Sequence, residues 1–191
     1  MKKNIFVLIP ALALIISSCG GGGEEGEAKE GEGNGDKANL DGMAEEDTLM
    51  AHGLNVPVFV PEELAPDGTQ IPSQIEPDPD NMMWKLRSGK KFSLVIRVSD
   101  GEGKYIERKK KELAGGIFKI EYLEEKPDYI MYKATLPDGN SELEFFRFYG
   151  VKKAGGEEYE FYSDESSEMR KVDVEMMKNS FLAFGEEIIE E

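Results

Sequence analysis

The chain has 191 residues, with 39 acidic residues against 23 basic ones and a formal charge of −16. An acidic excess of this size argues against binding to nucleic acid and against adhesion of the protein surface to anionic lipid. A single cysteine, Cys19, excludes an intramolecular disulfide framework.

The first residues have the pattern of an export signal. Lys2 and Lys3 provide a positive start, and residues 5–16 form a mostly apolar run that ends just before two small serines. This run is shorter than the roughly twenty apolar residues of a membrane-spanning helix. We therefore predict that residues 1–18 are a removable signal peptide.

The tetrad Ile16, Ser17, Ser18 and Cys19 closes this segment and resembles the lipobox of bacterial lipoproteins. The resemblance implies that Cys19 is lipidated on its sulfur, becomes the first residue of the mature chain and anchors it in a bacterial membrane, expected to be the outer membrane. A conventional signal with an incidental cysteine is the less favoured alternative. Lipidation of Cys19 would also leave no free thiol for catalysis or metal binding.

Residues 19–50 have the composition of a disordered tether. Glycines occupy positions 20–23, and the stretch has ten acidic residues but only two basic ones, Lys29 and Lys37. Such a stretch has too little apolar surface to offset the entropy cost of ordering. It also resembles the glycine-rich, acidic stretches that direct some Gram-negative lipoproteins to the cell surface, so surface-facing and periplasm-facing orientations both stay open.

Residues 51–191 are long enough for one globular domain. Alternating Val56, Val58 and Val60 predict a first strand, and the Pro-, Asp- and Gly-rich stretch Pro61–Asp80 predicts a long surface loop. Residues 84–98 then predict a β-hairpin that turns at Ser88 and Gly89.

A helix is predicted next. Ser99 and Glu102 match a capping box at its start, while Gly115 and Gly116 favour a left-handed exit at its end. Its basic residues predict a solvated helix with intrahelical pairs more strongly than a surface for an acidic partner or anionic ligand. They are Lys104, Arg108, Lys109, Lys110 and Lys111.

Four strands in a meander are expected after this helix, within residues 118–162, separated by turns at Pro127, 137–140 and 155–156. The run 145–149 is apolar on both faces. We therefore expect both faces of the sheet to be covered, with Phe146 and Phe148 buried opposite Phe145 and Tyr149.

The last helix is predicted over residues 165–184, capped by Ser163 or Asp164 and ended by Gly185. One helix for each sheet face predicts an α+β fold, namely an α-β-α sandwich around a largely antiparallel sheet. The order of elements over residues 54–184 resembles the Mog1/PsbP-like fold. That resemblance implies an architecture and no site residues.

Candidate chemistry is sparse in this sequence. It contains no Gly-x-Ser-x-Gly elbow, phosphate-binding loop, dinucleotide fingerprint or His-Glu-x-x-His motif. The lone histidine, His52, is better explained as an incidental polar residue than as a general base. Asp78, Asp80 and Asn81 offer oxygen ligands for calcium, but a plain turn is favoured because the rest of an EF-hand loop is missing.

Adjacent acids and aromatic residues are the remaining candidates. Glu157 with Glu158, and Glu142 with Glu144, are carboxylate pairs that chance explains in so acidic a chain. Strand aromatics are expected to be core rather than a ligand groove. They are Tyr129, Tyr132, Phe146, Phe148, Tyr149, Tyr159 and Tyr162.

The sequence thus predicts a lipid-anchored envelope lipoprotein with a non-enzymatic binding or structural domain. We expect no catalytic residue, cofactor, metal or nucleic acid; the partners are the membrane, through Cys19, and an envelope protein. Two alternatives stay open: a small-molecule or ion carrier that uses an aromatic pocket between sheet and helix, and a carboxylate-dependent enzyme. Two converging carboxylates, one with a raised pKa, would indicate the enzyme.

Overall fold

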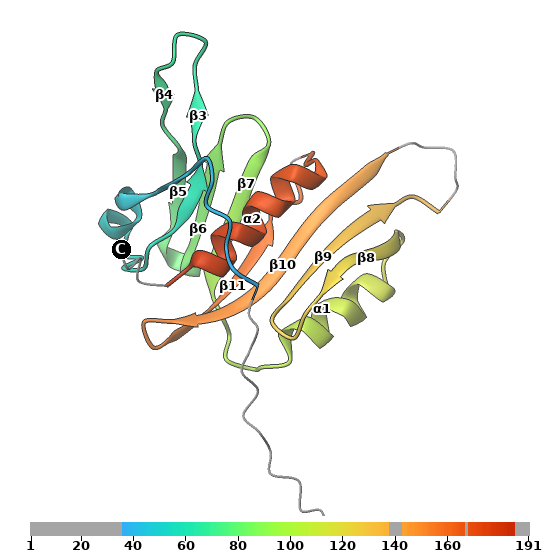
Figure 1. Cartoon of the computed structure of the whole chain (residues 1–191). Helices are drawn as coiled ribbons and strands as arrows, with labels where there is room; N and C mark the ends of the chain where they lie inside the picture. The colour runs from blue at the N-terminus through green and yellow to red at the C-terminus, as the bar shows by residue number, and fades with distance from the viewer. Residues whose placement is uncertain (1–35, 138–142, 167, 186–191) are drawn as a thin grey trace, which may run out of the picture. The chain divides into compact units, whose positions relative to one another are not determined.

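The computed structural model describes residues 36–137, 143–166 and 168–185 (Figure 1). The predicted signal peptide, Cys19 and the first part of the predicted tether lie outside the described residues. The fold is mixed α+β, with a mostly antiparallel sheet and two helices, as predicted. The helices are α1 (Tyr105–Ala114) and α2 (Lys171–Ala183).

The main sheet has seven strands in the order β5-β6-β7-β11-β10-β9-β8, and every neighbouring pair is antiparallel. In chain order the strands are β5 (Gln74–Asp78), β6 (Met83–Ser88), β7 (Phe92–Val98), β8 (Lys119–Glu125), β9 (Tyr129–Thr135), β10 (Glu144–Ala154) and β11 (Glu157–Ser163). The predicted hairpin is β6 with β7, and the predicted four-strand meander is β8 to β11. Pairing of β7 with β11 joins these two parts into one sheet.

The described fold begins before residue 51, so the predicted domain boundary is too late. Strand β1 (Met43–Glu45) pairs with β2 (Phe59–Pro61), and the 3-10 helix η1 (Asp47–His52) carries the fully buried Leu49. These few apolar residues are too sparse to form a strand pattern by themselves. They become ordered because β2, which follows later in the chain, supplies the backbone partner for β1.

Two other expectations near the N-terminus are wrong. The first predicted strand, Val56 to Val60, is a strand only from Phe59, although Val56 and Val58 are buried. The predicted loop 61–80 contains a small hairpin, β3 (Glu63–Leu64) with β4 (Gln70–Ile71), followed by the edge strand β5 and the 3-10 helix η2 (Pro79–Asn81). Because β5 is an edge strand, it tolerates a proline that would break a central strand.

Helix α1 starts later than its predicted capping box. Its N-cap is Lys104, with φ of 52°, and Ser99 instead donates a hydrogen bond to Glu158 (3.1 Å). The helix ends at Ala114, close to the predicted glycines. Gly115 has φ of −86°, however, so the predicted left-handed exit is wrong.

Helix α2 also starts later than expected, at Lys171 rather than residue 165. Asp173 holds the start of the helix, because the backbone N–H of Arg170 donates to its carboxylate at 2.8 Å. The predicted caps have other partners: Ser163 accepts from the Phe148 N–H (3.1 Å), and Asp164 pairs with Lys85. Gly185, with φ of 73°, follows the helix as predicted.

The core consists of two clusters. The larger one joins sheet residues such as Phe148 and Phe161 to Phe181 of α2, and the smaller one joins Tyr105 of α1 to Tyr149 and the β9 residues Ile130 and Tyr132. Since Phe148 and Tyr149 are neighbours on β10, their side chains point to opposite faces. The two clusters therefore lie on opposite sides of the sheet.

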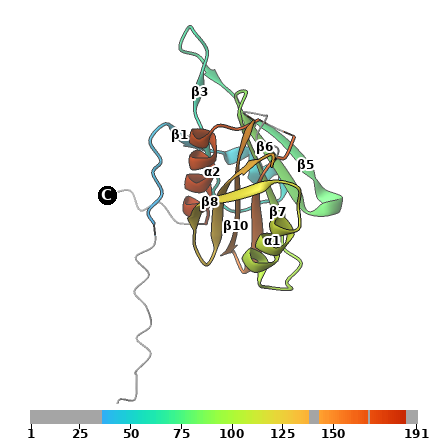
Figure 2. The same cartoon turned by 90° about the vertical axis from the view of Figure 1, so that its right-hand side faces the viewer.

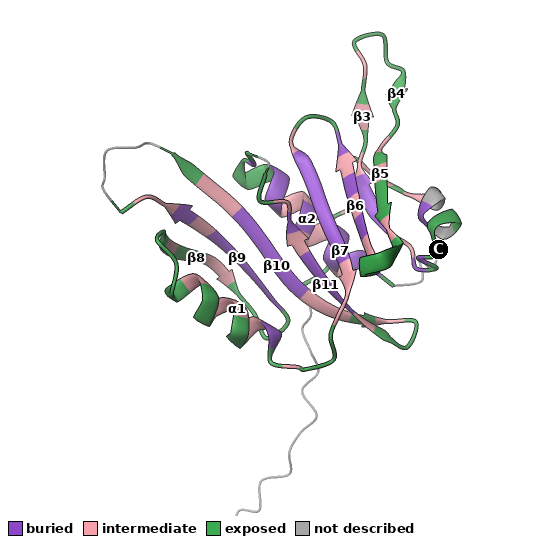
Figure 3. Cartoon of the chain, turned by 180° about the vertical axis from the view of Figure 1, so that it is seen from behind, coloured by how far each residue is buried: buried purple, intermediate pink, exposed green. Residues whose placement is uncertain are grey.

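The face that carries α1 is only partly covered. Helix α1 packs beside β8, β9 and β10, whereas neither α1 nor α2 lies in front of β6 and β7 in the view of Figure 3. In the view of Figure 2, strands β8 and β10 lie between α2 and α1. Helical cover of this face is therefore incomplete: Phe145 and Phe146 are only half-buried, although Ser93 and Val95 of β7 are buried.

Candidate ligand-binding cleft

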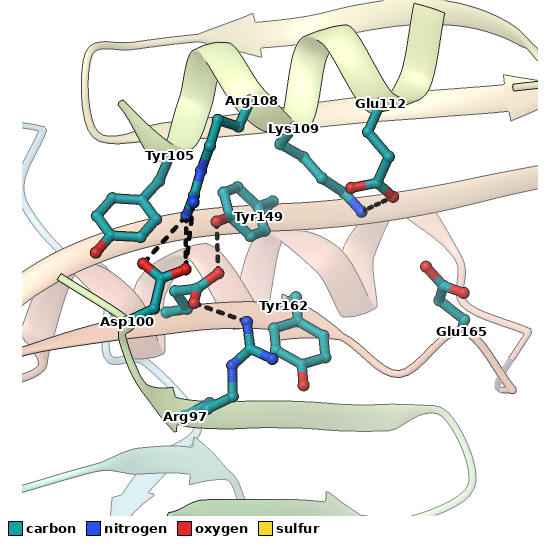
Figure 4. A pocket seen from close by; sticks show the side chains of 10 residues that line it. Arg97, Asp100, Tyr105, Arg108, Lys109, Glu112, Tyr149, Tyr162 and Glu165 are labelled. Atoms are coloured by element: carbon teal, nitrogen blue, oxygen red, sulfur yellow. Dashed lines mark hydrogen bonds and ion pairs between the residues drawn. The ribbon is translucent and has the colours of Figure 1, made fainter. Parts of the chain in front are cut away.

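A cleft with a volume of about 330 Å³ opens between α1 and the uncovered part of the sheet (Figure 4). Helix α1 lines it with Tyr105, Arg108, Lys109 and Glu112. These positions are spaced by three, one and three residues, which places them on one face of a helix.

The sheet lines the other side with side chains from three adjacent strands. Arg97 on β7 is the register partner of Glu160 on β11, and Tyr149 on β10 is the register partner of Tyr162 on β11. Alternation along β11 puts Glu160 and Tyr162 on the same face. Strand register, rather than sequence proximity, therefore gathers these four residues.

Glu160 is a buried carboxylate held from two sides. Arg97 Nη2 donates to its Oε1 at 2.7 Å, and the Tyr149 hydroxyl donates to its Oε2 at 2.7 Å. Burial, followed by this hydrogen bond, raises the pKa of Tyr149, and the hydrogen bond to Glu160 raises the pKa of Arg97. The tyrosine therefore stays a hydrogen-bond donor at neutral pH.

Two further ion pairs involve cations of α1, which runs along the top of Figure 4. Arg108 Nη1 contacts Asp100 at 3.2 Å, and its guanidinium lies 4.7 Å from the centroid of the Tyr105 ring. The backbone N–H of Glu102, followed by Arg108, lowers the pKa of Asp100. Lys109 Nζ contacts Glu112 at 2.8 Å. All three cations that line the cleft are thus paired with carboxylates.

Arg147, next to this site, is a residue that sequence reasoning missed. It occupies the aromatic run of β10, is only 9% exposed, and donates to the carbonyl oxygens of Phe146 (2.9 Å) and Glu165 (3.2 Å). Burial lowers the pKa of Arg147. Its hydrogen bond to the Glu165 carbonyl oxygen helps to position Glu165, whose side chain lines the cleft.

The arrangement is suited to binding more than to proton transfer. A carboxyl group that acts as a general acid at neutral pH needs a raised pKa. In the described chain, every carboxylate with a resolved shift has a lowered pKa. These residues are Asp36, Asp67, Asp100, Glu124, Asp164 and Asp173.

The polar candidates from the sequence lie outside the cleft. His52 is exposed at the end of η1, and its carbonyl oxygen accepts from Trp84 Nε1 at 2.9 Å. Asp78 caps η2 by accepting from the Asn81 N–H at 3.2 Å, and Asp80 is exposed on η2. This arrangement is the turn that the sequence favoured over a calcium loop. Among the described residues, no group of three or more His, Cys, Asp or Glu side chains could hold a metal ion.

The adjacent acids do not converge on a common centre. Glu157 accepts from the Tyr159 hydroxyl at 2.9 Å, whereas Glu158 accepts from Ser99. Glu144 pairs with Lys133 at 3.2 Å, and Glu142 lies outside the described residues.

The predicted aromatic set is mostly core, as favoured. Five of its members are buried, and Phe146 and Tyr162 are partly buried. Tyr149 and Tyr162 nevertheless line the cleft. From the basic face of α1, Arg108 and Lys109 do the same, while Lys110 pairs with Glu125 at 2.6 Å.

Comparison with protein families, with curated proteins and with solved structures gives no match. Of the helices in the described ranges, neither has the length and apolar character required to cross a bilayer.

Proposed function

We propose that this chain is a lipid-anchored envelope lipoprotein whose domain is a non-enzymatic binding module that takes a small polar ligand in the α1 cleft. The anchor is the lipid on Cys19, and the location is the outer membrane of a bacterium, facing either the surface or the periplasm. An envelope protein remains a candidate partner of the same domain.

The observation that carries the binding proposal is the cleft itself. It combines three tyrosines with paired donors and acceptors on a sheet face that α1 covers only in part. Concave sites with a few convergent polar groups are the usual places for small-molecule binding.

The carrier alternative draws on the same cleft. On the α2 side, aromatic rings pack on one another, with centroids 5.4 Å apart for Phe148 and Phe181 and 4.7 Å apart for Phe161 and Phe184. This packing disfavours an aromatic pocket on that side. The enzyme alternative has weaker support, because the resolved pKa shifts of the carboxylates are all downward.

The proposal includes a finer architecture, namely an α-β-α sandwich similar to the Mog1/PsbP-like fold. Its support is the alternation of Phe148 and Tyr149 between two core clusters, one containing α2 and the other containing α1. A crystal structure with α1 and α2 on the same face would refute this architecture.

The anchor is tested by Cys19→Ala. We expect the variant to accumulate as unprocessed or soluble precursor, whereas the unmodified chain is processed and found in the membrane fraction. A variant that stays in the membrane fraction with unchanged processing would contradict the lipoprotein proposal.

The cleft is tested by native mass spectrometry of the full chain purified from its own envelope. We expect a bound small molecule that Arg108→Gln loses. Arg87→Gln is the matched control, because the Arg87–Glu76 pair (3.0 Å) lies outside the cleft and Arg87 has similar exposure, 38% against 41% for Arg108. Equal retention by all three proteins would show that the cleft is not the binding site.

A further inference from the structure

We infer that the ligand of the α1 cleft is a neutral, polyhydroxylated molecule of the size of a small oligosaccharide. This inference rests on the proposed binding function and adds the chemical class of the ligand. It depends on three properties of the cleft: the pairing of its charges, the accessibility of its paired donors and acceptors, and the ring of the partly buried Tyr162.

The pairing of charges disfavours an anionic ligand. Each lining cation already has a carboxylate partner: Arg97 at 2.7 Å, Arg108 at 3.2 Å and Lys109 at 2.8 Å. A phosphate or carboxylate ligand would have to displace one of these partners and leave it unpaired. The acidic excess of the whole chain adds long-range repulsion.

The same pairs suit hydroxyl groups. A hydroxyl both donates and accepts hydrogen bonds, so it can accept from a guanidinium and donate to the neighbouring carboxylate without breaking the ion pair. The pair of Arg108 and Asp100 is accessible for this purpose, with side chains 41% and 49% exposed. Arg97 is 44% exposed, while its partner Glu160 is held from behind by Tyr149. The Arg108–Asp100 pair thus offers both an acceptor and donors to one ligand hydroxyl.

Of the lining tyrosines, Tyr162 is the one with ring area left for the carbon skeleton of a sugar. Tyr105 and Tyr149 are buried and shape the wall of the cleft, whereas Tyr162 is only partly buried and has the Arg97 guanidinium 5.8 Å from its ring centroid. The volume of about 330 Å³ lies at the lower end of the range for small-molecule sites. A short oligosaccharide therefore fits the chemistry and the size of the cleft together.

The test is a calorimetric titration of the full chain, kept in a detergent without a sugar headgroup. The probes are maltotriose and triacetylchitotriose as neutral oligosaccharides, triglycine as a zwitterion, spermidine as a cation and inorganic phosphate as an anion. We expect at least one oligosaccharide to bind and the other three probes not to bind. Arg108→Gln should weaken that binding about tenfold, because it removes a charged hydrogen-bond donor, and Arg87→Gln should leave it unchanged.

Asp100→Asn is a second variant of the same exposed pair, and circular dichroism checks that both variants fold. Weaker oligosaccharide binding by both variants, with native spectra, supports the inference. Binding of phosphate, triglycine or spermidine instead would overturn the ligand class and leave the proposed binding function standing. Absence of binding by both oligosaccharides, or equal binding by the wild-type chain and both cleft variants, would overturn the inference, while native mass spectrometry tests the binding function separately.

Discussion

Asp164→Asn offers a quantitative test of the charge network on the open face of the sheet. The Asp164 side chain is 12% exposed and pairs with Lys85; its Oδ2 also accepts from Ser93 Oγ at 3.2 Å, and its Oδ1 from Ser166 Oγ at 2.8 Å. Burial alone would raise the pKa of Asp164. The hydrogen bonds from Lys85 and Ser166 outweigh burial and lower this pKa to about 2.

The size of the effect follows from this pKa. A fall from 3.8 to about 2 corresponds to about 2 kcal/mol of folding free energy. Because the pKa is lower in the folded state, this stabilisation is fully present above the unfolded-state pKa and is lost as the pH falls toward the folded-state value. Asp164→Asn should therefore cost about 2 kcal/mol at neutral pH and progressively less between about pH 4 and pH 2.

The assay is urea unfolding of the wild-type chain and the variant at a series of pH values. Glu168→Gln is the control: its side chain is 82% exposed and its distance to Lys91 is 4.0 Å, so we expect a change below about 0.5 kcal/mol. If the cost of Asp164→Asn is the same at pH 2 as at pH 7, it arises from packing or hydrogen-bond geometry, and the charge argument is wrong.

Three further predictions concern stability and are read from unfolding midpoints. Phe148→Ala should cost about 3 to 5 kcal/mol because Phe148 is 1% exposed, and Phe145→Ala should cost clearly less because Phe145 is only half-buried. Equal losses in the two variants would refute this difference in burial. Gly150→Ala should cost about 1 to 3 kcal/mol, since the added Cβ would lie 2.8 Å from the Phe181 ring; an unchanged midpoint would mean that the ring moves freely. Tyr129→Phe should cost about 1 to 3 kcal/mol, because the Tyr129 hydroxyl donates to Asp36 at 2.7 Å and contacts Glu124 at 2.9 Å. It should also speed hydrogen exchange around Asp36, and unchanged exchange there would show that this contact does not hold the segment.

The sequence alone determined the local features of this protein. Alternating apolar residues predicted the β6–β7 hairpin and the meander from β8 to β11, and glycines marked where both helices end. These signals are local, because side-chain alternation and turn chemistry act within a few residues of the chain. The lipobox-like tetrad that ends at Cys19 is likewise a property of the sequence, and the proposal of a lipid anchor depends on it alone.

The starts of elements were harder to predict, since tertiary partners compete with local caps. Ser99 and Asp164 have the chemistry of helix caps, but each is used by a distant strand residue, Glu158 and Lys85 respectively. Strand β1 and edge strand β5 carry little apolar alternation, and they become strands because β2 and β6 offer open backbone groups.

The candidate cleft was decided by tertiary structure. Arg97 and Glu160 are 63 positions apart and meet only because β7 pairs with β11 in one register. A shift of one residue would turn Glu160 to the α2 side, where an ionised carboxylate would lie among aromatic rings. Register and the partial cover by α1 are set by the packing of the whole domain, so residue spacing in the sequence could not indicate which charges share the cleft.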